Sequence, residues 1–282
     1  MMTIIMNDSS SENRVTREVG VRLVNGRSKT IEDKRDEVAV EAPLHILVNG
    51  ARYASILCSP SDQQALVVGN MAAEGIIRSL DEMVGIRAEG GGAYVVTLRS
   101  DIDISKRIDI TSSFKRLILS SCGGSPSDWP FTKIIDRINM PSVGKDRTLY
   151  KLEIIAACVR ELNNLAKTFK RTGGVHGAAL YTSDGSLLSF AEDVGRHNAV
   201  DKVIGLAFQQ RNSFVGTLIA STGRLTGDIV LKAARMRIPL VASLATAISS
   251  GIDVAAGTGV TLVGFVRGER MTIYTHPDRV SW

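Results

Sequence analysis

From residue 172 onward the sequence alternates between short apolar stretches and longer amphipathic ones, and this alternation restricts the fold more than any other feature. The predicted elements of this region are a hairpin over residues 178–190 with its turn at Asp184-Gly185, helices over 194–210, 227–236 and 248–259, and strands over 217–221, 238–243, 260–268 and 270–276. Strands that alternate with helices favour an α/β fold, in which helices pack over a partly parallel, mixed sheet. Ligands of such sheets bind at the carboxyl ends of strands, so the polar residues that follow these strands are candidates for a binding site.

The first part of the chain has a different pattern. Residues 37–60 predict two strands joined by a hairpin turn at Asn49-Gly50. Asp62 is expected to cap a helix over residues 63–77, and Tyr94–Leu98 has the alternation of another strand. This region is therefore expected to form a small α+β unit.

A segment rich in small residues, SSCGGSPSDWP around Cys122, separates the two regions. A linker follows it, and then a helix predicted over residues 149–169, within which Cys158 is expected to be a buried structural thiol. The expected division of the chain is a flexible lead-in over 1–36 with a first strand near Val19–Val24, a small α+β domain over 37–115, the Cys-bearing loop and linker over 116–145, and an α/β domain over 146–282.

Composition excludes several classes of protein. Hydrophobic residues make up 44% of the chain, which suits a globular core, but the longest apolar runs are too short to cross a bilayer. The N-terminal residues contain no secretory signal, so we expect a cytoplasmic protein with no membrane partner. The net charge is +5, without a dense Lys/Arg block and with only 5% aromatic residues, which argues against a nucleic-acid partner. A phosphorylated small molecule or an acidic protein would explain the positive charge equally well.

The three cysteines indicate a reducing compartment rather than a disulfide framework. They have no zinc-ligand spacing, and the four histidines are scattered, so no metal site is expected. Cys122 is flanked by Ser121 and by Gly123-Gly124, which leave a thiol accessible, and nearby basic residues would favour its thiolate form. The local sequence alone fits a reactive thiol and an incidental loop cysteine equally well.

Polar motifs follow the predicted strands of the C-terminal region at several points. The segments 172–177, 192–198 and 221–228 contain His176, Arg196 with His197, and Arg224, respectively. The last segment is a glycine-containing loop that opens a helix, where free N–H groups favour an anion. The alternatives are a turn with a hydrogen-bonded histidine for the first segment and a structural capping network for the second, in which Asp193 could cap the helix and hold Arg196 or His197.

The hairpin between the last two strands is the remaining candidate for a binding segment. It places two arginines on a tight turn, which would suit a phosphate group or would simply form a solvated charged turn. The residues of this segment are Phe265, Val266, Arg267, Gly268, Glu269 and Arg270.

Several stretches of the sequence together resemble one known family. They are EAPLHILVNG and AAEGII in the N-terminal part, and GGVHGAAL, EDVGRHNAVDKVIG and VTLVGFVRGERMTIYTHPDRV in the C-terminal part. Read together, they resemble the formate dehydrogenase accessory sulfurtransferase family, FdhD, from about Val38 to the C-terminus.

The resemblance implies a function, a site and partners. Members of this family accept sulfur as a persulfide from a cysteine desulfurase and pass it to the molybdenum or tungsten bis-pterin guanine dinucleotide cofactor, which then enters formate dehydrogenase. The persulfide cysteine of the family matches Cys122, and its cofactor-binding segment matches Phe265 to Arg270. The resemblance also implies a cytidine-deaminase-like fold for the C-terminal domain, joined to a small α+β domain, and a homodimer.

The chain departs from the family pattern at one position. The family motif is Cys-x-x-Cys, whereas the chain reads Cys122-Gly123-Gly124-Ser125. Ser125 cannot form a disulfide with Cys122 or relay a persulfide, so a cofactor-binding chaperone without sulfur transfer is the alternative function. A nucleotide-modifying enzyme on the deaminase-like fold is disfavoured, because His176-Gly177-Ala178 is not His-x-Glu and no Pro-Cys-x-x-Cys follows.

Overall fold

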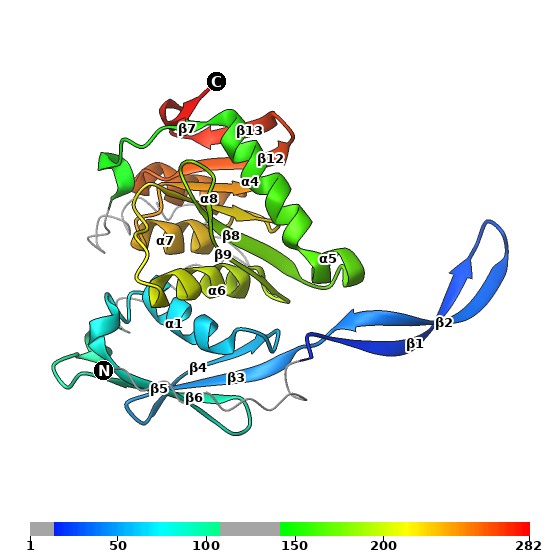
Figure 1. Ribbon diagram of the computed structural model, residues 1–282, viewed down its shortest axis with the longest axis horizontal. Helices are drawn as coiled ribbons and strands as arrows, with labels where there is room; N and C mark the ends of the chain where they lie inside the picture. The colour runs from blue at the N-terminus through cyan, green and yellow to red at the C-terminus, as the bar shows by residue number, and fades with distance from the viewer. Residues whose placement is uncertain (1–13, 108–141) are drawn as a thin grey trace.

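A computed structural model of the protein describes residues 14–107 and 142–282. Cys122 and its neighbours lie outside the described residues, as does most of the segment expected over 116–145. The described residues form a mixed α/β protein built on two main sheets with a pair of helices between them, as Figure 1 shows.

The larger sheet has six strands in the order β13-β12-β11-β10-β8-β9, and β10, β11 and β12 run parallel to one another. The elements of this half are β7 (Tyr150–Lys151), α4 (Leu152–Leu165), α5 (Lys167–Thr172), β8 (His176–Thr182), β9 (Leu187–Asp193), α6 (Arg196–Gln209), β10 (Thr217–Ser221), α7 (Gly227–Arg235), β11 (Leu240–Ser243), α8 (Ser249–Thr258), β12 (Thr261–Arg267), β13 (Arg270–Thr275) and β14 (Val280–Ser281).

Alternation along the central strands gives each face of this sheet its own hydrophobic core. In β10, Leu218 and Ala220 are buried in the cluster that includes α4, whereas Ile219 between them belongs to the cluster formed with α6, α7 and α8. Because successive side chains of a strand point to opposite faces, one strand serves both cores. The sheet is therefore covered on both faces, as the alternating pattern predicts (Figure 1).

The smaller sheet has four strands in the order β4-β3-β6-β5 and is covered on one face by α1. Its elements are β3 (Ala42–Val48), β4 (Ala51–Cys58), α1 (Gln63–Ala73), β5 (Met83–Glu89) and β6 (Ala93–Leu98). Asn49 and Gly50 both have positive φ, 49° and 82°, which is the conformation that a tight hairpin turn requires.

Two glycines let α1 and α6 cross with their backbones in contact. A Cβ atom on Gly69 would lie 1.8 Å from the backbone oxygen of Asp201, and one on Gly205 would lie 1.9 Å from the backbone oxygen of Ala65. Neither neighbour is a flexible side-chain end, so no larger residue fits at these two positions. This crossing joins the two halves of the protein.

Replacing Gly205 with alanine should lower the free energy of unfolding by about 1–3 kcal/mol, because the two helices must move apart to admit the methyl group. Chemical denaturation of the variant measures this loss. The matched control is Gly85→Ala, since no atom lies within 4 Å of a Cβ built on Gly85. Equal stabilities of the two variants would contradict the assignment of a tight crossing.

Several predicted elements are confirmed. Both hairpins occur, at Asn49-Gly50 and at Asp184-Gly185, and the strand expected at Tyr94–Leu98 is β6. Helices occur in all three of the intervals predicted after residue 190.

Other predictions differ from the structure in detail. The helix predicted over 149–169 is divided into α4 and α5, because Ala166 takes a non-helical conformation with ψ of 67°. Asp62 occupies the position before α1, but its backbone is left-handed and its side chain makes no capping hydrogen bond, so the predicted cap is wrong. The predicted helix over 63–77 ends at Ala73, shortly before Gly75 at φ 76°.

Strands β1 (Thr16–Asn25) and β2 (Thr30–Ala39) form a separate antiparallel hairpin, which we call the ribbon. Figure 1 shows the ribbon extending away from the rest of the molecule. The first strand predicted near Val19–Val24 is part of β1, whereas β2 was not predicted. Within the described ranges, no helix has both the length and the apolar character needed to span a membrane.

Candidate functional site

The strand ends of the six-stranded sheet converge on one edge, which we call the strand-end edge. The parallel strands β10, β11 and β12 finish there, and β8, which runs antiparallel to β10, begins there with His176. His176 pairs with Asp193 at the end of β9, and α6, α7 and α8 all start from this edge. This is the edge at which sheets with helical crossovers bind ligands.

His176, Arg196, His197 and Arg224 lie together at this edge. Burial and the neighbouring guanidinium groups of Arg196 and Arg224 lower the pKa of His176. Burial, followed by the charges of Arg196 and Lys232, lowers the pKa of His197 to about 3. The structure thus brings together four residues that the sequence analysis named from three separate motifs.

These pKa shifts decide which of the four residues carry charge. Both histidines are neutral near pH 7, because desolvation and nearby cations disfavour their protonated forms. The Nε2 atom of His197 lies 3.2 Å from Oγ1 of Thr226, within hydrogen-bond distance. The positive charge at this edge therefore comes from Arg196, which is partly buried, and Arg224, which is exposed.

The loops after β10 and β11 run side by side and repeat the same local structure. Ser221 accepts a hydrogen bond from the N–H of Gly223, and Ser243 accepts one from the N–H of Ala245. Leu225 and Ala247 then form a parallel bridge between the two loops. Two helix N-termini, those of α7 and α8, are thereby held next to each other, and both favour an anionic ligand.

The segment from Phe265 to Arg270 begins at the same edge, on β12. Phe265 is an exposed aromatic residue with φ of 52°, in a β-bulge, and its N–H donates to the backbone oxygen of Ala245. Nη1 of Arg267 donates to the backbone oxygen of Leu244 at 2.7 Å. Val266 is buried, and Arg270 is exposed, with no hydrogen bond or ion pair from its side chain to the described residues.

Three polar residues of the segment 192–198 make hydrogen bonds that stabilise the fold and do not contribute to the candidate site at the strand-end edge. Both carboxylate oxygens of Glu192 accept backbone N–H groups at the start of α5, from Thr168 and Phe169. Asp193 accepts hydrogen bonds from Gly195 and from Asn198, so it orders Asn198 at the start of α6. The segment combines a structural network with two residues, Arg196 and His197, at the candidate site.

Asp193 also forms a fully buried ion pair that the sequence analysis missed. Nζ of Lys202 lies 2.6 Å from Oδ2 of Asp193, and neither side chain is exposed. The same lysine donates to the backbone oxygen of Ser59 at 3.1 Å, and the N–H of Ser59 donates to Asp193. The pair therefore ties the end of β4 to the end of β9 and to the middle of α6. The sequence signal that could have indicated this pair is the position of Lys202, a charged residue on the apolar face of the helix predicted over 194–210.

A second buried network joins α1, α6 and α7. Nζ of Lys232 contacts both carboxylate oxygens of Asp201, at 2.6 and 2.8 Å, and lies 3.2 Å from Glu74. Asn70 donates to Asp201 from α1. The charges of Lys232 and Glu74 also act on the pKa of His197, in opposite directions.

The two described cysteines are unsuited to nucleophilic chemistry. Cys58 and Cys158 are buried, and burial raises the pKa of Cys58 to about 11 and that of Cys158 to about 12. Both thiols are therefore protonated near pH 7, whereas the thiolate is the reactive form. In the described ranges, no group of three or more His, Cys, Asp or Glu side chains could hold a metal ion.

Comparisons with known proteins agree on one family. Residues 39–281 match the FdhD/NarQ family. The sulfur carrier protein FdhD of Geobacillus kaustophilus is 33% identical over 258 residues, covering 91% of this chain and 93% of its own length. That of Wolinella succinogenes is 35% identical over 260 residues, covering 91% and 86%. A crystal structure of a formate dehydrogenase accessory protein from Desulfotalea psychrophila is similar with a TM-score of 0.74 at 26% identity, covering 95% of this chain and all of that one.

Proposed function

The chain belongs to the FdhD/NarQ family, and on that basis we propose that it is a sulfur carrier that serves formate dehydrogenase. The observation that carries the proposal is the position of Cys122 within the matched residues 39–281. The high pKa values of Cys58 and Cys158 support the same assignment, because they leave Cys122 as the thiol best suited to carry sulfur.

The first step is a transfer between two thiols. The Cys122 thiolate attacks the outer sulfur of a persulfide on a cysteine desulfurase, the sulfur–sulfur bond of the donor breaks, and the donor leaves as a thiolate. Cys122 then carries the persulfide, and no net oxidation or reduction takes place. Mass spectrometry of the chain after incubation with a desulfurase and cysteine tests this step, because an unmodified Cys122 would exclude it.

Delivery of the sulfur as sulfide requires two electrons, and here Ser125 matters. A second cysteine at this position could attack the persulfide, release hydrosulfide and leave a disulfide, but the hydroxyl of Ser125 cannot. We propose that an external thiol supplies these electrons. Release from the loaded protein should therefore depend on added thiol.

The molybdenum or tungsten bis-pterin guanine dinucleotide cofactor is the client in this proposal. Its guanine nucleotides carry pyrophosphate groups, and the strand-end edge offers chemistry that suits them. Arg196 and Arg224 supply positive charge, and the adjacent N-termini of α7 and α8 favour anions. The segment from Phe265 to Arg270 adds an exposed aromatic side chain and the exposed guanidinium of Arg270.

Replacing Arg270 with alanine should weaken the binding of GDP by about 1–3 kcal/mol, because one charge-assisted contact is lost. Isothermal titration calorimetry measures the affinity. Arg160→Ala is the matched control, since Arg160 lies exposed on α4 and the variant loses the same charge away from the strand-end edge. Absence of GDP binding to the intact protein would remove the basis for this client.

A cofactor-binding chaperone is the second candidate, and Ser125 is the observation that favours it. It shares the client and the strand-end edge with the first proposal but needs no thiol. We further propose a cysteine desulfurase and formate dehydrogenase as partners, a homodimeric assembly, and a cytidine-deaminase-like fold for the half that contains the six-stranded mixed sheet. The order of strands in that sheet supports the last point.

A further inference from the structure

The ribbon is a strand pair that nothing else in the described chain covers. Every residue from 22 to 36 is exposed, and only the base of the ribbon packs against the protein, where Ala39 lies beside Gly174. An isolated two-stranded hairpin is marginally stable in water. Its two outer edges also present unpaired backbone N–H and C=O groups, which are templates for another strand. The ribbon therefore has the features of a segment that is completed by a partner.

The two outer edges of the ribbon differ in sequence. From Glu32 to Glu37, β2 reads EDKRDE, six consecutive charged residues, and a charged edge discourages pairing with another strand. In contrast, β1 places Val19, Val21 and Leu23 on one face, at every second position. This alternation is typical of a half-buried strand, although Leu23 is 48% exposed. The open edge of the ribbon is therefore β1.

We propose that β1 pairs, antiparallel and edge to edge, with β1 of a second copy of this chain, with Val21 opposite Val21 of the partner subunit. In this register Val19 faces Leu23 of the partner subunit and Leu23 faces Val19 of the partner subunit. The three apolar pairs lie on the same face, so two stripes that are separate in the single chain become one. Cross-strand pairs of β-branched and other apolar residues stabilise a sheet.

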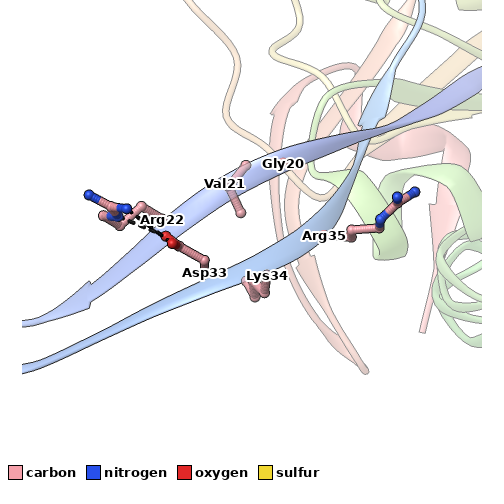
Figure 2. A pocket seen from close by; sticks show the side chains of 6 residues that line it. All are labelled: Gly20, Val21, Arg22, Asp33, Lys34 and Arg35. Atoms are coloured by element: carbon pink, nitrogen blue, oxygen red, sulfur yellow. Dashed lines mark hydrogen bonds and ion pairs between the residues drawn. The ribbon is translucent and has the colours of Figure 1, made fainter.

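The charges of β1 fit the same register. Arg17 would face Asn25 of the partner subunit, Glu18 would face Val24, and Gly20 would face Arg22, so no like charges are opposed. Arg22 is in addition paired within its own ribbon, with Nε at 2.7 Å from Oδ1 of Asp33, as Figure 2 shows. The carboxylate of Asp33 thus neutralises the charge of Arg22 within the single chain, before pairing with a second copy.

Residues 20–22 of β1 and 33–35 of β2 line an open hollow of about 580 Å³ on the ribbon (Figure 2). Pairing through β1 would give a continuous four-stranded sheet in the order β2-β1-β1-β2, in which the charged β2 edges remain outermost. Only β2 would then present unpaired edges, and those edges carry the charged run.

Cysteine cross-linking tests the register directly. This inference rests on the proposed homodimer. Val21→Cys should form a disulfide between two copies under mild oxidation, because directly opposed residues of an antiparallel pair have Cα atoms about 4.5–5.5 Å apart. Val24→Cys is the matched control, since in this register the two residues 24 lie six positions apart, roughly 20 Å. Mass spectrometry identifies the linked peptides and separates them from any disulfide of Cys122.

Sedimentation of Val21→Lys supplies an independent measurement. Two opposed lysines should raise the dissociation constant of the dimer by about tenfold, whereas Val24→Lys, which would face Glu18 of the partner subunit, should not weaken it. Equal cross-linking of the two cysteine variants, or a dimer that Val21→Lys leaves unchanged, would overturn the proposed surface. A chain that sediments as a monomer at all concentrations would overturn the dimer as well. Loading of sulfur on Cys122 is measured separately, so none of these results depends on the proposed carrier function.

Discussion

Cells in which Cys122→Ala replaces the protein should show no more formate dehydrogenase activity than cells that lack the protein. The proposed transfer requires a thiolate to attack the persulfide, and alanine offers no nucleophile. The other two cysteines cannot substitute, because burial holds the pKa of Cys58 and of Cys158 far above 7. Formate dehydrogenase activity and circular dichroism of the purified variant together separate a lost function from a lost fold.

Ser125→Cys is the matched control for this variant. It restores the Cys-x-x-Cys arrangement of the family while keeping Cys122, so activity should be retained and the need for external thiol reduced. Full formate dehydrogenase activity with Cys122→Ala would reject the sulfur-carrier proposal and leave the cofactor chaperone as the function.

Lys202→Met should lower the free energy of unfolding by about 3–5 kcal/mol. The substitution leaves the carboxylate of Asp193 buried without its cation, and an uncompensated buried charge is costly. Methionine has a similar length, so the effect comes from the charge rather than from a cavity. Denaturation in urea measures the loss.

An exposed ion pair provides the comparison. Arg211 and Asp81 are 2.8 Å apart, but their side chains are 66% and 65% exposed, so Arg211→Met should change stability by less than about 1 kcal/mol. Similar losses for Lys202→Met and Arg211→Met would show that the buried pair has no special role at the junction of β4 and α6.

Hydrophobic periodicity predicted the larger sheet well, because the apolar residues of its strands and of the helices that cover it form the two cores, one on each face of the sheet. The parallel strands β10 and β11, and the hairpins at Asn49-Gly50 and Asp184-Gly185, follow from local pattern and turn chemistry. The interruption at Ala166 does not, since nothing in the apolar spacing marks it. The second strand of the ribbon was missed because its run of charges lacks the alternation of a half-buried strand.

The sequence indicated which polar residues belong to the motif 192–198, but not which of them stabilise the fold and which lie at the strand-end edge. Sequence alone placed Glu192, Asp193 and Arg196 in one polar motif. Only the three-dimensional structure separates the carboxylates, which bind backbone N–H groups or a buried lysine, from Arg196 at the strand-end edge. Partners such as Ser59 lie more than 130 residues away along the chain, so no local pattern could have indicated them.

The close contact between α1 and α6 limits how the protein can move. Gly69 and Gly205 bring the two helix backbones together with no side chain between them, and buried ion pairs flank the contact. The two helices cannot shift or rotate relative to each other without breaking this close packing and leaving buried charges without their partners. The two sheets must therefore move together as one rigid body. If the proposed cofactor binds at the strand-end edge, it would have to enter and leave through rearrangement of surface loops and side chains, and not through a hinge between the two sheets.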